Sequence, residues 1–206
     1  MPVERWVRFQ KGHDIGFRAR KLFPGGKDAS PSHVSRFNES ITLTQHFISE
    51  NISIIYEAAF VFNDVLAALD ILVHDAEGWH GFEVKSSIAV SSTYINDAAL
   101  QYYVITGAGL ALNDFSIIHL KKNLKEISET DLAEDIFIKT DVTAQCIEQS
   151  EVIHAHIEKL KVILAEKRMP QREMGEHCHQ PYTCDFIGFC SNHTDEVKTG
   201  LFAAIE

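Results

Sequence analysis

The sequence lacks any apolar run long enough to span a membrane, and it does not open with a charged stretch followed by an apolar core. It also lacks internal repeats and low-complexity tracts. These absences argue against a membrane protein, a secreted protein and a repeat protein, so we expect a cytoplasmic protein with no membrane partner. With 206 residues, 45% of them hydrophobic, the chain can form one domain with a sizeable core.

A net positive charge is also missing. The chain has 19 lysines and arginines against 29 acidic residues, which gives a formal charge of −10. A field of this sign repels nucleic acid, but local basic patches and a bound metal ion can offset it at a site. Two basic patches stand out, one including Arg18, Arg20 and Lys21 and one formed by Lys121, Lys122 and Lys125. We take the first as a candidate DNA-binding segment, with ordinary solvated surface as the alternative.

Cysteine is scarce, with only four residues in the chain. In a reducing compartment such residues are more often thiols or metal ligands than disulfides. Cys178, Cys184 and Cys190 are separated by five residues each, in a segment that also contains proline and glycine. This spacing favours a metal or cluster loop; the alternative is three unrelated buried thiols.

The hydrophobic pattern predicts an α/β protein. We expect helices over 35–50, 94–106 and 143–168, and strands over 54–62, 65–74, 79–86, 114–120 and 136–138. The order is a helix, a three-strand meander, a helix and a strand, which predicts a central mixed sheet flanked by helices. We expect a domain over residues 1–170, with a cysteine-rich tail over 171–206 packed on it.

Acidic residues occur on three successive predicted strands. Glu57 lies on the first, Asp70 on the second, and Glu83 on the third, two residues before Lys85. Neighbouring strands are about 4.8 Å apart, so their carboxylates can share one ion. Carboxylates bind hard cations such as Mg²⁺ or Mn²⁺, and a lysine can position or polarise the attacking water. The alternative for Glu83 and Lys85 is a solvated ion pair.

Three further residues extend this candidate site. Val84 would offer its backbone carbonyl as another oxygen ligand. Asp97 and Gln101 are four residues apart on the following helix and share one face. Gln101 could contact a phosphate or orient the lysine or water, unless it is a plain surface residue. For Asp97 we expect charge complementarity with the helix N-terminus.

The pattern Glu57…Asp70…Glu83-x-Lys85…Gln101 resembles the PD-(D/E)XK nuclease superfamily, in its RecB-like branch, and is close to an uncharacterised bacterial family there. The resemblance covers roughly residues 12–192. It implies a restriction-endonuclease-like core and metal-dependent hydrolysis of DNA in repair, recombination or defence. It further implies that Asp70 and Glu83 are metal ligands, Lys85 the catalytic lysine and Gln101 the helix glutamine.

The chain departs from this family in two places. RecB-like enzymes carry a metal-binding histidine on the first helix, where this chain has Arg20, which cannot ligate a cation. Glu57 is the expected replacement ligand, and His46 is a weaker candidate. The family glutamine is followed four residues later by tyrosine, whereas this chain has Ile105 there.

The tail carries a second resemblance. Iron–sulfur RecB-like nucleases have a similar C-terminal cysteine group, which implies a 4Fe–4S cluster held by Cys178, Cys184 and Cys190. The fourth ligand would be Cys146 or would come from an upstream segment. Zinc is the alternative occupant, using His177, His179 or His193 with the cysteines. Either metal would have a structural role.

Three functions are therefore considered. The first is a metal-dependent nuclease that acts on DNA, with single-stranded ends as the expected substrate. Its expected partner is a helicase or another subunit of a nuclease complex. The second is a catalytically weak nucleic-acid-binding or assembly module of the same fold. The third, a cysteine and histidine metal-storage or redox protein, explains the tail but not the acidic residues on the strands.

Overall fold

The computed structural model describes residues 14–33, 35–128, 130–166 and 173–192. The chain separates into two compact units, one up to Ile153 and one from His154, and each is described by itself. The expected boundary at residue 170 lies outside the described residues.

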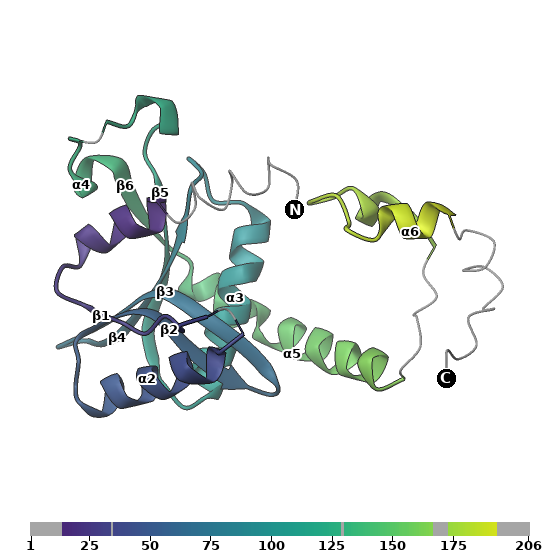
Figure 1. The fold of residues 1–206 in the computed structure, drawn as a ribbon, viewed down its shortest axis with the longest axis horizontal. Helices are drawn as coiled ribbons and strands as arrows, with labels where there is room; N and C mark the ends of the chain where they lie inside the picture. Colours follow the sequence, from purple (N-terminus) through teal and green to yellow (C-terminus); the bar gives the residue numbers. More distant parts are fainter. Residues whose placement is uncertain (1–13, 34, 129, 167–172, 193–206) are drawn as a thin grey trace. The chain divides into compact units, whose positions relative to one another are not determined.

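A six-stranded mixed sheet forms the centre of the first unit (Figure 1). Its strands follow one another in space in chain order: β1 (Lys27–Asp28), β2 (Ile54–Phe62), β3 (Val65–Asp75), β4 (Gly78–Lys85), β5 (Leu112–Leu120) and β6 (Phe137–Asp141). Strands β2, β3 and β4 form the antiparallel meander, and β4 and β5 are parallel neighbours. Strand β1 is parallel to β2, and β6 is antiparallel to β5. The prediction of an α/β protein with a mixed sheet and helices around it is confirmed.

Helices cover both faces of the sheet. The first unit contains a helical segment over residues 14–19, then η1 (Arg20–Leu22), α2 (Phe37–Ser49), α3 (Ser92–Gly107), η2 (Leu124–Glu126), α4 (Ala133–Ile136) and the start of α5 (Thr143–Ala165). The second unit contains the rest of α5, η3 (Glu176–Cys178) and α6 (Ile187–Asn192). The side chain of Ser91 caps α3 by accepting from the Tyr94 N–H. Across the described residues, none of these helices combines the length and apolar character needed to cross a membrane.

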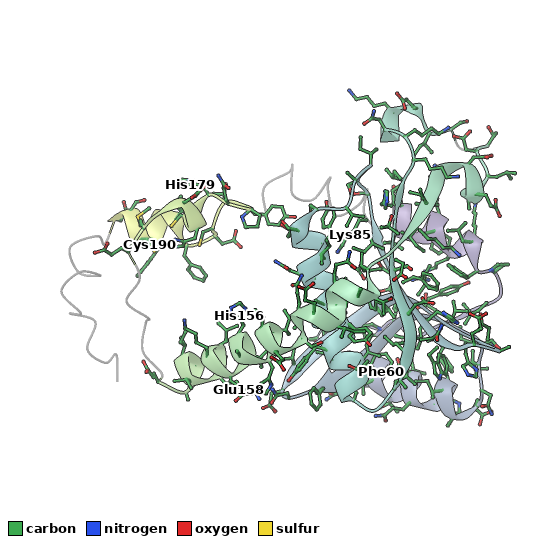
Figure 2. The ribbon with its side chains drawn as sticks, turned by 180° about the vertical axis from the view of Figure 1, so that it is seen from behind. Phe60, Lys85, His156, Glu158, His179 and Cys190 are labelled. Atoms are coloured by element: carbon green, nitrogen blue, oxygen red, sulfur yellow. The ribbon has the colours of Figure 1, made fainter. Side chains whose placement is uncertain are left out.

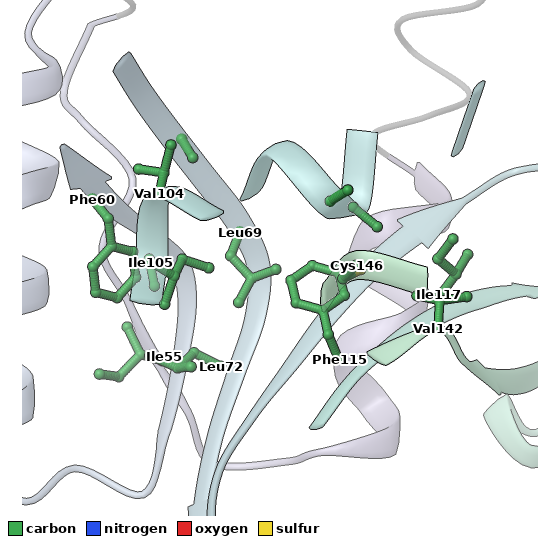
Figure 3. Close-up of a cluster of buried hydrophobic side chains, with 14 of the residues drawn as sticks. Ile55, Phe60, Leu69, Leu72, Val104, Ile105, Phe115, Ile117, Val142 and Cys146 are labelled. Atoms are coloured by element: carbon green, nitrogen blue, oxygen red, sulfur yellow. The ribbon is translucent and has the colours of Figure 1, made fainter. Parts of the chain in front are cut away.

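The first face of the sheet packs against α3 and the start of α5 (Figure 3). Leu69 and Phe115 from the strands meet Val104 and Ile105 of α3, and Cys146 of α5 is buried in the same cluster. The second face packs against the helical segment 14–19 and α4. Its cluster comprises Ile15, Ala19, Tyr56, Ile71, Phe82, Ile118, Leu120, Ala133, Ile136 and Phe137. Because both faces are covered, the central strands are apolar on both sides.

Strand β2 changes face at Glu57. Ile55 and Ala58 both pack in the first cluster, although they are three residues apart, while Tyr56 packs in the second. Regular alternation cannot produce this pattern. The backbone of Glu57 has a φ of +54°, in the left-handed region, and this single residue turns the strand over. Such strain in a residue other than glycine is typical of functional sites.

Strand β3 changes face at the neighbouring position. Leu69 and Leu72 pack in the first cluster, while Ile71 packs in the second. The pairs on either side, Tyr56 with Ile71 and Ala58 with Leu69, place Glu57 opposite Asp70. The two strands therefore turn over together at one point, and both residues at that point are acidic.

Helix α2 supports the backbone at this point. The Ser40 hydroxyl donates to the Glu57 carbonyl at 3.2 Å, and the Thr44 hydroxyl accepts from the Ala59 N–H at 2.9 Å. Both hydroxyl-bearing residues are buried. These hydroxyls hydrogen-bond backbone groups of β2 beyond the point where the short strand β1 stops pairing with it.

Gly81 of β4 offers a test of the core packing. A Cβ there would lie 2.8 Å from the ring of Phe115, which is fully buried, and 3.4 Å from Leu69. We expect Gly81→Ala to lower the free energy of unfolding by about 1–3 kcal/mol in chemical denaturation, because the ring has nowhere to move. Gly16→Ala is the matched control, since a Cβ there meets nothing within 4 Å and alanine favours the surrounding helix. Equal effects of the two changes would contradict this packing.

Candidate functional site

Asp70 lies at the point where the strands turn over, beside β4. Its Oδ2 accepts from the Val84 N–H at 2.6 Å, so the carboxylate is directed at β4. The β3–β4 register, extended by one pair, puts Asp70 opposite Glu83. Burial, followed by the negative charges of Glu83 and Glu57, raises the pKa of Asp70 well above its usual range, despite the Val84 N–H. The expected proximity of Asp70 and Glu83 is therefore present.

Glu83 is buried on the face of the sheet that α3 covers. Its Oε1 accepts from Lys85 Nζ at 2.8 Å, and its carboxylate also hydrogen-bonds Gln101. Burial raises the pKa of Glu83, and the positive charge of Lys85 offsets this only in part. The expectation that Glu83 and Lys85 share one face of β4 is confirmed by their contact.

Lys85, labelled in Figure 2, is held between two carboxylates. Its Nζ donates to Glu83 and to Asp97 of α3, and it lies 5.4 Å from the ring centre of Tyr94. Burial alone would lower the pKa of Lys85, but Glu83 and Asp97 outweigh burial and raise it. The side chain is therefore a fixed positive charge. It can stabilise developing negative charge, but it cannot take up a proton.

Gln101 is 7% exposed and lies one helical turn after Asp97. While its amide hydrogen-bonds Glu83, its Oε1 has no hydrogen-bond partner among the described residues. A buried acceptor without a partner costs about 1–3 kcal/mol, so this oxygen points to a missing donor or cation. The alternative of a plain surface glutamine is wrong, because the residue is buried.

Arg20 binds the remaining carboxylate of the predicted site. Its Nη2 lies 2.8 Å from Glu57 Oε1 and its Nη1 lies 2.6 Å from Asp28 Oδ2. The guanidinium carbon is 4.7 Å from the ring centre of Tyr56, and only 16% of the side chain is exposed. Arg20, predicted as a DNA contact, is therefore engaged within the protein.

The other predicted basic residues are more accessible. Lys21 is exposed, and Arg18 donates to the Ser128 carbonyl at 2.6 Å on the surface. Their contact with DNA stays a prediction. His46, the weaker candidate ligand, is exposed on α2.

The described residues contain no group of three or more histidine, cysteine, aspartate or glutamate side chains already arranged to hold a metal ion. Glu57 is paired with Arg20, and Glu83 is paired with Lys85. The donor chemistry nevertheless fits a hard divalent cation, because the site offers carboxylates and the unpartnered amide oxygen of Gln101. Ligation by the Val84 carbonyl stays a prediction; what the structure adds is the contact of the Val84 N–H with Asp70.

Two contacts of the site were missed by sequence reasoning. Asp97 was expected to complement the helix N-terminus, but it binds Lys85. The available signal was that Asp97 lies four residues before Gln101, which places both side chains on one face of α3. The pairing of Arg20 with Glu57 had no local signal, because 37 positions separate the two residues.

The cysteines fall in different parts of the protein. Cys146 is fully buried in the core of the first unit, and burial raises the pKa of its thiol to about 12. In the tail Cys178 is buried, and Cys184 and Cys190 are half-buried; all are free thiols. Figure 2 labels Cys190 and His179 in this segment.

Hydrogen bonds hold the tail cysteines in one folded segment. The Cys184 N–H donates to the Cys178 carbonyl at 2.9 Å, and the Sγ of Cys178 lies 3.6 Å from Nε2 of His177. His193 lies outside the described residues. The identity of any bound metal stays a prediction.

His80 forms a second charged cluster in the sheet. Its Nδ1 lies 2.6 Å from Asp114 Oδ2 and its Nε2 lies 2.9 Å from Asp75 Oδ1. Burial would lower the pKa of His80, but the hydrogen bonds with Asp114 and Asp75 outweigh burial and raise it. Since both ring nitrogens face carboxylates, the doubly protonated ring fits this position best.

Comparison of the chain with protein-family models, with curated proteins and with solved structures found no match.

The His80 cluster predicts a specific pH dependence of stability. Because its pKa is higher in the folded protein than in the unfolded chain, its contribution is complete below the unfolded value of about 6.5 and is lost as pH rises through the folded value. We expect His80→Gln to cost about 1 kcal/mol near pH 6, with a smaller cost near pH 9, in denaturant titrations. Asp114→Asn should weaken the same pH dependence. A cost for His80→Gln that grows with pH would contradict this arrangement.

Proposed function

We propose that the chain is a Mg²⁺- or Mn²⁺-dependent nuclease that hydrolyses phosphodiester bonds in DNA, built on a restriction-endonuclease-like core of the RecB-like type. One observation carries the proposal: Asp70, Glu83 and Lys85 come together beside Gln101, whose Oε1 has no partner among the described residues. Such a site combines ligands for a hard cation, a fixed positive charge and a free acceptor.

Each side chain then has a task in phosphodiester hydrolysis. Asp70 and Glu83 would hold the cation, which when bound supplies electrophilic stabilisation of the reacting phosphate. Lys85, charged and clamped, stabilises the negative charge that develops on the phosphate oxygens. Gln101 Oε1 can accept a hydrogen bond from the attacking water and so orient it.

The proposed substrate is DNA, with single-stranded ends favoured by the likeness to iron–sulfur nucleases. Arg18 and Lys21 are the basic residues near the site's Arg20 that would track the backbone. A helicase or another subunit of a nuclease complex is the proposed partner. The protein would then act in DNA repair, recombination or defence.

A catalytically weak nucleic-acid-binding or assembly module is the second candidate. Two observations favour it: Lys85 and Arg20 are each held by two carboxylates, and the chain has a net charge of −10. Both features reduce the positive charge available to a phosphate. DNA cleavage by the wild type and by variants of Asp70 and Lys85 separates the two candidates.

We further propose that the tail binds a 4Fe–4S cluster, or zinc as the alternative, through Cys178, Cys184 and Cys190. Within described residues 173–192, Cys178 is the one buried side chain, while Tyr182 and Phe186 are 62% and 70% exposed. A segment this short with so little apolar burial usually needs a metal or another cross-link to hold its shape. Cys146 is fully buried in the first unit's core, whereas His177 lies beside Cys178 within the same segment, so His177 is the fourth ligand that we propose for zinc.

The nuclease proposal is tested with labelled single-stranded and duplex DNA and Mn²⁺. We expect Asp70→Asn and Lys85→Met each to lower the cleavage rate by about 100-fold or more. The first change weakens the binding of the cation, and the second removes the fixed positive charge that stabilises the reacting phosphate. Lys121→Met is the matched control, since this exposed lysine binds the Glu134 carbonyl away from the site. Equal rates in all four proteins would remove the nuclease proposal and favour the binding module.

The tail proposal is tested by metal analysis of the chain purified without oxygen. Iron with sulfide indicates the cluster, and zinc indicates the alternative. We expect Cys184→Ser to lose the metal, because it removes one of three thiolate ligands, and Cys146→Ser to keep it. His177→Ala should lose zinc but not iron. Metal that survives Cys184→Ser would contradict the assignment.

A further inference from the structure

Two fixed cations lie at opposite ends of the acidic cluster. Lys85 binds Glu83 and Asp97 at one end, and Arg20 binds Glu57 at the other. Arg20 is held by further contacts, because it also binds Asp28 and lies over the ring of Tyr56. The two positive charges at the site are therefore already paired with the carboxylates at its two ends.

Asp70 lies between these ends and has a different environment. It faces Glu57 on β2 and Glu83 on β4, and its carboxylate accepts a hydrogen bond from the Val84 N–H. No ion pair joins it to a lysine or arginine in the part of the chain that the structure describes. The uncompensated negative charge of the cluster is thus centred on one residue.

Charge counting gives the size of the deficit. The carboxylates that surround Arg20 and Lys85 are those of Asp28, Glu57, Asp70, Glu83 and Asp97. When all are ionised they carry five negative charges against the two positive charges of Arg20 and Lys85, which leaves three negative charges. One divalent ion would leave the cluster with a single negative charge, whereas two would leave it positive.

Gln101 supplies an independent indication of a ligand here. Its side chain is over nine-tenths buried and bonded to Glu83, and its Oε1 has no partner among the described residues. An amide oxygen is a good ligand for Mg²⁺ or Mn²⁺, directly or through water. Glu83, one carboxylate of the acidic cluster, and the side chain that carries the free acceptor thus meet between β4 and α3.

Resting on the nuclease proposal, we propose that the site takes a single divalent ion centred on Asp70, and that Arg20 blocks a second ion by occupying Glu57 with its own charge. Glu57 is then a partner of Arg20 and not a metal ligand. Arg20 is a positioning residue: its guanidinium sets the charge at one edge of the site without touching the substrate.

The test is a titration of the full chain with Mn²⁺ alone, without DNA, followed by electron paramagnetic resonance and calorimetry. We count only those Mn²⁺ ions that the wild type binds and Asp70→Asn does not. This excludes any ion bound by the tail cysteines. The asparagine keeps an acceptor for the Val84 N–H, so the fold should persist, and circular dichroism checks it. We expect one such ion in the wild type.

Three variants decide the role of Arg20. Arg20→Ala should bind two ions, because Glu57 becomes free, and Glu57→Gln should bind one ion with affinity within about 3-fold of the wild type. Arg36→Ala, which removes an arginine from an exposed pair with Glu39, is the matched control and should bind one. Two Asp70-dependent ions in the wild type, loss of binding in Glu57→Gln, or one ion in Arg20→Ala would each overturn the inference.

The outcomes also separate this inference from the nuclease proposal. One Asp70-dependent ion without DNA cleavage would overturn the nuclease proposal and support the single-ion site. DNA cleavage with two Asp70-dependent ions would support the nuclease proposal and overturn the single-ion site.

Discussion

The left-handed backbone of Glu57, opposite Asp70, is the constraint on which the rest of the site depends. It turns β2 over, and β3 turns over beside it, so that Ile55 and Ala58 reach one core while Tyr56 and Ile71 reach the other. A regular pair of strands would send all these side chains to alternating faces. Helix α2 satisfies the backbone at this point through buried hydroxyls. The strain and the polar support are both located where the acidic residues gather, which is where a functional site tolerates such a cost.

Electrostatics gives this point its chemistry. Burial and mutual repulsion raise the pKa values of Asp70 and Glu83, while Lys85 and Arg20 are fixed at the two ends by carboxylates. The cluster is thus crowded with negative charge that the chain's own cations leave uncompensated. We propose that a divalent cation completes it, and that the same cation draws a phosphate to an otherwise acidic protein. The tail, in our proposal, is a separate metal-dependent segment with a structural task.

The sequence predicted the elements well and some of the site. The spans of β2, β3 and β4 agree with expectation to within a residue or two, because strong apolar runs are separated by the turns Asn63-Asp64 and Ala76-Glu77. The pairing of Glu83 with Lys85 followed from alternation alone. The contact between Lys85 and Asp97 did not, since it depends on how closely α3 packs on β4. Likewise, the sequence could not show that Gly16 continues a helix or that Ser91 caps α3.

What the sequence by itself determined is the order of the strands and helices and the type of chemistry that their acidic and basic residues offer. Both follow from local properties, namely periodicity, turn residues and donor type. Only the tertiary structure decided which charges pair. Arg20 reaches Glu57 across 37 positions, and Cys146 is enclosed by the sheet and α3 in the first unit. Such contacts depend on strand register and helix docking, which long-range packing sets and no local pattern encodes.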